Sequence, residues 1–184
     1  NLFSESVNKS PSLILGNTNY VKKVIFPLEI LPVICLGSAA FHWAINALAW
    51  LIVYVLFIGI PSPTILILPV LMIPVLLISI GFGWFLASLA VYIRDVTQIV
   101  SIAVSILLFM SPVFYEISAV PEQYRQLFTL NPMTLAIEQV RNLMMWGQLP
   151  DWRAWGLYAA LSALIAWLGF VWFQKTRKGF ADVL

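Results

Sequence analysis

Residues 30–93 read ILPVICLGSAAFHWAINALAWLIVYVLFIGIPSPTILILPVLMIPVLLISIGFGWFLASLAVYI. This run contains no Asp, Glu, Lys or Arg, and His42 is its one side chain that titrates near neutral pH. A single membrane crossing needs about 20 apolar residues, so the run is too long for one span. The Pro-Ser-Pro tripeptide at 61–63 supplies a break, because prolines on both sides of a serine favour a turn. We therefore predict two spanning helices, over 32–58 and 64–93.

The composition excludes several classes of protein. The 184 residues are 61% apolar and 10% charged, with a mean hydropathy of +0.94, whereas a soluble domain is about 45–50% apolar and about 25% charged. Disorder requires few apolar residues and a high net charge, and nucleic-acid binding requires clustered Lys and Arg. A net charge of +2 argues against both. We predict an all-α, polytopic membrane protein in the lipid bilayer, with no nucleic acid as partner.

Two further charge-free runs extend the predicted helical bundle. Residues 96–115 form the third run, in which Ser111 and Pro112 favour a helix end. Residues 154–174 form the fourth run, between two basic side chains. The sequence therefore predicts four full spans, and we expect Gly81 and Gly83 to allow close helix packing within them.

The basic residues favour one orientation of this bundle. Six of them fall in alternate connecting segments and in the tail: Lys22, Lys23, Arg94, Lys175, Arg177 and Lys178. The intervening segment, 116–153, holds three. Since Lys and Arg are enriched in cytoplasmic loops, we predict that the six lie in the cytoplasm together with the C-terminal tail, 175–184.

The beginning of the chain is more polar than the spans. Residues 1–16 are too polar to lie in lipid on all sides, so if they cross the membrane they must face protein or water. Asn17 or Asn19 is suited to cap a short helix over 20–26, which Pro27 stops. We predict that this two-turn helix lies at the cytoplasmic surface.

The segment 121–147 is typical of two short helices. Asn131 and the proline after it provide a cap and a first helical residue, and Gly147 provides a stop after about Trp146. Some fifteen residues cannot cross a bilayer alone. Glu138 and Arg141 form an i,i+3 pair on the face opposite an apolar stripe. We predict a pair of half-helices at the outer face, packed on the spans.

The sequence lacks the motifs of several kinds of chemistry. It has no Gly-rich phosphate loop, His-Glu-x-x-His, paired cysteines or nucleophile elbow, so we predict no enzyme, cofactor or metal site in this chain. Secondary transport needs ionisable groups inside the spans, where only His42, with Glu29 near the inner end, could serve. We therefore expect the energy for any uphill transport to come from another polypeptide that contacts the two-turn helix.

Six motifs, in order, carry a resemblance to a known family: NTNYVKKVIFP at 17–27, EILP at 29–32, YIRD at 92–95, SPVFY at 111–115, LNPM at 130–133 and GFADVL at 179–184. The chain resembles the membrane subunit of bacterial polysaccharide and polyol-phosphate ABC exporters, which move lipid-linked O-antigen, capsule or teichoic acid. The resemblance implies a type-2 ABC exporter permease fold in the bacterial inner (plasma) membrane. It also implies a homodimer of six-span subunits, each with a cytoplasmic ATPase that binds ATP and Mg²⁺.

The resemblance also assigns segments of the chain. It makes 1–16 the inner part of span two, 17–26 the coupling helix that docks on the ATPase, and 121–147 the external gate helices. The spans over 32–58, 64–93 and 96–115 become three to five, and 154–174 becomes six. The N-terminal helix and span one of the family have no counterpart in this sequence, so we expect a missing N-terminal portion.

Individual residues receive candidate roles, with simpler alternatives left open. Five residues are candidates for ATPase coupling: Asn19, Tyr20, Lys22, Lys23 and Glu29. Three are candidates for the substrate channel, where aromatic faces would slide past sugar rings: Phe109, Phe114 and Tyr115. Four are candidates for the external gate: Tyr124, Asn131, Glu138 and Arg141. The alternatives are topology signals for the lysines, a lysine partner for Glu29, core packing for the aromatic rings and a solvated face for the Glu138–Arg141 pair.

Three functions remain open at this point. The first is the pore subunit of an ATP-driven exporter of lipid-linked glycan. The second is a permease of the same architecture that exports drugs or small lipids, because the motifs do not report substrate size. The third is a membrane scaffold or enzyme that handles lipid-linked sugars without pumping them.

Overall fold

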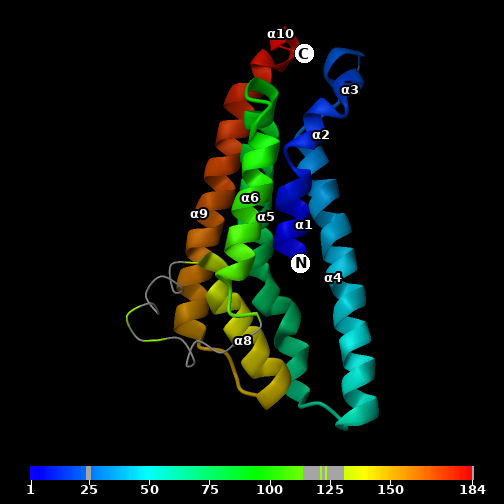
Figure 1. Cartoon of the computed structure of the whole chain (residues 1–184), viewed down its shortest axis with the longest axis vertical. Coiled ribbons are helices and arrows are strands. Elements are labelled where there is room, and N and C mark those ends of the chain that lie inside the picture. Colours follow the sequence, from blue (N-terminus) through cyan, green and yellow to red (C-terminus); the bar gives the residue numbers. More distant parts are fainter. Residues whose placement is uncertain (24–25, 114–120, 122, 124–130, 184) are drawn as a thin grey trace.

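The computed structural model describes residues 1–23, 26–113, 121, 123 and 131–183. Three long helices run along the bundle in Figure 1: α4 (Ile30–Phe57), α5 (Leu68–Tyr92) and α9 (Trp152–Thr176). Each is long and apolar enough to cross a membrane. The predicted all-helical membrane fold is therefore confirmed.

The break between α4 and α5 falls at the predicted position. Gly59 has a φ of 121°, a conformation that residues with a Cβ rarely adopt. Pro63 then begins the 3-10 helix η1 (Pro63–Ile67), which leads directly into α5. Local backbone chemistry thus turns one long apolar run into two antiparallel neighbours.

The closest helix contact joins α5 to α9. A methyl group added to Gly81 of α5 would lie 2.7 Å from the carbonyl oxygen of Ile165, and one added to Gly169 of α9 would overlap the carbonyl oxygen of Gly81. Missing side chains at both positions let the two backbones approach. Close packing was predicted at Gly81 and is confirmed there, whereas a methyl group added to Gly83 would make ordinary contacts, with Ser10 Oγ at 3.4 Å.

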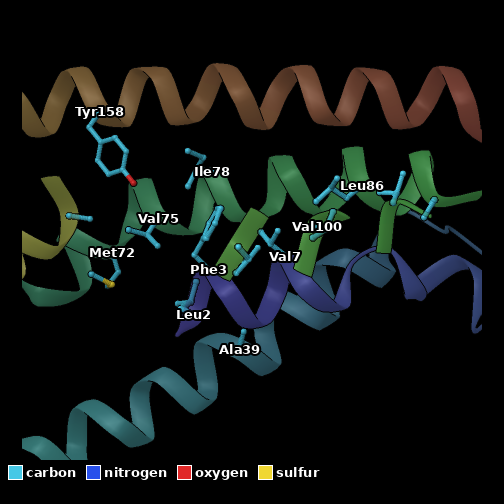
Figure 2. Packing of buried hydrophobic residues seen from close by; sticks show 14 residues of the cluster. Leu2, Phe3, Val7, Ala39, Met72, Val75, Ile78, Leu86, Val100 and Tyr158 are labelled. Carbon is cyan, nitrogen blue, oxygen red and sulfur yellow. The ribbon is translucent and has the colours of Figure 1, made fainter. Parts of the chain in front are cut away.

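The first helix, α1 (Leu2–Lys9), lies inside the bundle and packs against α4, α5 and α6 (Val96–Phe109). It buries Leu2, Phe3, Ser6 and Val7. Figure 2 shows its apolar side chains between the ribbons of α4 and α5. The polar residues 1–16 therefore face protein on one side, as lipid requires of such a segment.

The predicted full span over 96–115 needs correction. The helix α6 ends at Phe109, ahead of Ser111 and Pro112. Its 14 residues cover about 21 Å at 1.5 Å per residue, which is less than the roughly 30 Å of a hydrocarbon core. The helix α8 (Pro132–Trp146) occupies the other half of the bundle's length (Figure 1). In the described part of the chain, the half-length helices α6 and α8 thus stand where a full span over 96–115 was predicted beside α8.

Much of the outer surface is apolar. The most apolar stretch of α4 has no buried residue, and Leu56 and Phe57 near its end are 74% and 83% exposed. The outer face of α9 exposes Leu157 and Leu161 in the same way. Continuous apolar surface of this kind is unsuited to water and suited to lipid or to another protein.

The short elements gather at one end of the bundle. These are α2 (Ser12–Leu15), α3 (Thr18–Lys23), η3 (Arg177–Gly179) and α10 (Phe180–Val183), beside the α5–α6 turn (Figure 1). We call this the basic end, because it carries Lys22, Lys23, Arg94, Lys175, Arg177 and Lys178. The opposite end holds η1, α8 and the beginning of α9. The six basic residues that the sequence placed on one side of the membrane therefore share one end of the bundle.

Candidate functional site

The short helix α3 lies at the basic end and begins at Thr18, earlier than the predicted Tyr20. The side-chain amide of Asn17, one residue before the helix, donates to the carbonyl of Leu13 at 2.8 Å. Tyr20 is 41% exposed and stacks on Phe26, with ring centroids 4.9 Å apart.

The other coupling candidates on α3 can be placed only in part. Asn19 is exposed. Lys22 and Lys23 form the end of the helix, and their side chains lie outside the described part of the chain. The helix thus presents an exposed, polar surface at the basic end, and the coupling role of these residues stays a prediction.

Glu29 contacts the end of α9. Its Oε2 accepts a hydrogen bond from Arg177 Nη1 at 2.9 Å, which also makes an ion pair. Its backbone carbonyl accepts from Trp84 Nε1 at 3.0 Å. Among the side chains that the structure describes, the ion-pair partner of Glu29 is an arginine 148 positions further along the chain, and not a lysine. The N-terminus of α4 is thereby tied to the C-terminus of α9.

A small apolar core lies under α3, and we call it the tail core. Its members are buried side chains from five helices, α2, α4, α5, α9 and α10: Ile14, Leu31, Ala87, Val91, Phe173 and Phe180. Phe173 and Phe180 are fully buried and meet edge to face, with ring centroids 5.7 Å apart. Val21 of α3 packs against this core. Of these residues, only Leu31 and Phe180 fall within the motifs that carry the family resemblance.

A polar cluster joins α1 to α4 midway along the bundle. His42 Nδ1 lies 2.8 Å from Glu5 Oε1, and Lys9 Nζ donates to the same oxygen at 2.7 Å. An open cleft of about 510 Å³ lies beside the cluster and is also lined by Ser4 and Asn46. The described residues contain no group of His, Cys, Asp and Glu that could hold a metal ion.

Asn131 fastens α8 to α6 at the opposite end. Its Oδ1 accepts a hydrogen bond from the backbone nitrogen of Met133 at 2.9 Å, as the predicted cap requires. Its amide donates to the carbonyl of Leu107 at 3.1 Å and to Ser111 Oγ at 2.9 Å. The predicted stop is also observed, because Gly147 has a φ of 63°. One buried asparagine therefore starts α8 and closes the end of α6.

Arg141, of the predicted pair Glu138 and Arg141, does not sit on the face opposite the apolar stripe. Arg141 donates to the carbonyls of Pro112 and Val113, the latter at 3.2 Å. It also lines the same cavity as the residues of the apolar stripe, which are Met133, Ala136, Ile137, Val140 and Met144. The placement of this pair on the opposite face was thus wrong for Arg141, which connects α8 to the turn after α6.

Burial raises the pKa of the Glu138 carboxyl above its usual value, and the nearby charge of Arg141 opposes this shift without cancelling it. A raised pKa means that the fold favours the protonated form. The contribution of this carboxyl to the free energy of unfolding is therefore fully present below its pKa in the unfolded chain, which is about 4.3. It is lost as the pH rises through the pKa of the same carboxyl in the folded protein.

Glu138→Gln is accordingly expected to raise the melting temperature at pH 7. Its advantage over the wild type should shrink toward pH 4, where the wild-type carboxyl is neutral as well. Thermal unfolding in detergent between pH 4 and 8 measures this difference. An advantage that stays constant across the range, or a variant less stable at pH 7, would contradict the assignment.

A cavity of about 540 Å³ lies between α1, α4, α5, α6 and α8. Its wall is mostly apolar, with Trp43, Met72 and Met144 among its lining residues, and Arg141 and Ser111 add polar atoms. Phe109 is 76% exposed and does not line this cavity.

The remaining aromatic candidates cannot be placed. Phe114, Tyr115 and Tyr124 lie outside the described residues. A channel role for Phe109, Phe114 and Tyr115, and a gate role for Tyr124, stay predictions.

Sequence comparisons agree with this architecture. A family model described as ABC-2 type transporter matches residues 1–145. The chain is 25% identical over 182 residues to the O-antigen export system permease protein RfbA of Myxococcus xanthus, covering 98% of this chain and 70% of that protein. A Klebsiella pneumoniae protein of the same name is 24% identical over 186 residues, covering 99% of this chain and 70% of that protein. The similarity therefore extends over nearly the whole chain.

Proposed function

We propose that this chain, which belongs to the ABC-2 type transporter family, is the pore subunit of an ATP-driven exporter of lipid-linked polysaccharide. It is a membrane subunit, and in this family the ATPase is a separate subunit that binds the nucleotide. The observation that carries the proposal is the similarity, along 98% of the chain, to a permease named for O-antigen export. O-antigen, capsule and teichoic acid are the glycan classes that we consider.

For the orientation, we infer that the basic end faces the cytoplasm of a bacterium and that the membrane is the inner one. The support is the gathering of six basic residues at that end, since cytoplasmic loops carry an excess of Lys and Arg. In this orientation α3 is the coupling helix on which the ATPase acts. The helix α8 and the segment 121–130 then lie at the external face.

For the assembly, we infer a homodimer with its path for the glycan between the two copies. An apolar stripe on α6 supports this inference, because it is exposed along the whole helix: Ile99, Ile102, Ile106 and Phe109. A second copy would cover such a stripe. Phe109 at its end remains our candidate for contact with passing sugar rings, together with Phe114 and Tyr115.

Reconstitution with the ATPase subunit tests the proposed function. Proteoliposomes should translocate a labelled lipid-linked polysaccharide only when both subunits and ATP are present. Unlabelled glycan lipid should compete, and drugs or small lipids should not. Competition by drugs or small lipids alone would favour a permease for those compounds. Movement of the glycan without the ATPase, or its chemical modification, would overturn the proposal in favour of a scaffold or enzyme.

The double variant Lys22→Glu with Lys23→Glu tests the coupling role of α3. Export should fall by about tenfold or more, because like charges or lost ion pairs at a docking surface weaken association. Insertion and thermal stability should be unchanged, since both residues lie at the end of a surface helix. Lys175→Glu is the matched control, an exposed basic residue at the same end but on α9. Unchanged export in the double variant would contradict the coupling role.

A further inference from the structure

The part of the C-terminal tail that follows α9, residues 177–183, lies directly beside α3, and we call it the tail from here on. The helix α3 packs against α2 and against α10, two elements at opposite ends of the sequence. Val21 of α3 contacts the tail core, of which Phe180 is a member. A partner that displaces α3 would therefore also act on the tail, because α3 packs against it.

Three attachments hold the tail and the last residue of α9, Thr176, from which it continues. Arg177 pairs with Glu29 at 2.9 Å, which joins the end of α9 to the beginning of α4. Tyr92 at the end of α5 donates from its hydroxyl to the carbonyl of Thr176 at 2.8 Å. Phe180 is fully buried, although it belongs to a helix of only four residues. Because this short segment makes several specific contacts, it has a defined position in the fold.

The contact between tail and α5 is also close. A methyl group added to Gly179 would lie 2.7 Å from the hydroxyl oxygen of Tyr92. The ring of Tyr92 lies 6.1 Å from that of Phe180. The tail is thus packed against α5 as well as continuing from α9, and the backbones of these two helices already approach each other at Gly81 and Gly169.

We propose that the tail is a positioning device that transmits displacement of α3 to α9 and α5, in addition to the direct chain connection from α3 to α4. This inference rests on the proposed function, because it assumes that an ATPase acts on α3. Arg177 and Phe180 are the positioning residues. Phe180 fixes the tail in the tail core, and Arg177 fixes the beginning of α4 to the same support.

Charge swapping between Glu29 and Arg177 tests this link in the reconstituted complex. Arg177→Glu alone and Glu29→Arg alone should each lower the amount of glycan exported per ATP hydrolysed by about tenfold. An effect of this size is typical of the coupling between two sites in a protein. The double swap should return this ratio to within about threefold of the wild type. The remaining deficit arises because the swap also reverses charges at two helix ends. Lys178→Glu, the same charge change one residue further on, is the matched control.

A second variant tests the tail without changing a charge. Phe180→Ala should release the tail, so that the amides of residues 177–183 exchange hydrogen faster while the ATPase still binds. The ratio of export to hydrolysis should fall in parallel. Val183→Ala, on the same helix but 48% exposed, should change neither quantity.

The outcomes separate the two proposals. A wild-type complex that exports no lipid-linked glycan would overturn the proposed function. A wild-type complex that exports normally, with single charge variants at the wild-type ratio or a double swap that fails to recover, would overturn the role of Arg177. Faster tail exchange in Phe180→Ala with an unchanged ratio would overturn the role of the tail.

Discussion

Gly169→Ala is expected to destabilise the protein by about 3 kcal/mol or more, the upper part of the range for overpacked sites. The added methyl group would overlap the backbone carbonyl of Gly81 on α5. A backbone oxygen cannot rotate away as a flexible side chain can, so α5 and α9 would have to separate. Thermal unfolding in detergent and the yield of folded protein measure the effect.

Gly156→Ala provides the control on the same helix. No atom lies within 4 Å of a methyl group added at Gly156. Alanine also favours the helix over glycine by up to about 1 kcal/mol. This variant should be as stable as the wild type or more so. Equal stability of the two alanine variants would show that the contact between α5 and α9 is looser than described.

Asn131→Ala is expected to cost about 2–4 kcal/mol. The variant loses the cap of α8, worth about 0.5–2 kcal/mol. It also removes the two hydrogen bonds from the amide to Ser111 Oγ and to the carbonyl of Leu107, each worth about 0.5–1.5 kcal/mol. Those two groups keep the hydrogen bond between them, at 2.6 Å. Asn131 is only 5% exposed, so water cannot readily replace the side chain.

Chemical denaturation measures this cost, with Asn142→Ala as the matched control. Asn142 is an exposed asparagine on the same helix, and its replacement should change stability by less than about 0.5 kcal/mol. The position of α8 against α6 should loosen in Asn131→Ala only. A cost no larger than that of the control would mean that the three hydrogen bonds of Asn131 do not hold the two helices together.

Local backbone chemistry explains which parts of the fold the sequence predicts well. The turn at Gly59 and the Pro-Ser-Pro tripeptide, and the two ends of α8, depend on glycine, proline and an asparagine cap within a few residues. Burial of α1 inside the bundle depends on neighbours distant in sequence, whereas the early end of α6 follows the local signal at Ser111 and Pro112. Gly156 and Gly169 show what local sequence cannot predict. Both interrupt apolar runs of α9, yet only Gly169 lies against the backbone of another helix, α5.

In the candidate site, too, features set by neighbouring residues were predicted and contacts between distant residues were not. Asn131 was predicted as a cap from its neighbours, and its cap is observed. Its hydrogen bonds to α6 could not be predicted, nor could the partners of Glu29 and His42. Arg177 is 148 positions from Glu29, and Glu5 is 37 positions from His42. No helical periodicity relates residues at such separations, so only the assembled bundle identifies these pairs.

The central claim is that force from an ATPase enters this chain through α3 on the cytoplasmic side. Labelling of Asn19→Cys in a Cys35→Ala background with a membrane-impermeant maleimide tests it most directly, because Asn19 is exposed on α3 and Cys35 is the single native cysteine. The account predicts labelling in inverted vesicles but not in intact cells, and protection when the ATPase subunit is bound. Labelling from the outside of intact cells, or no protection by the ATPase, would contradict it.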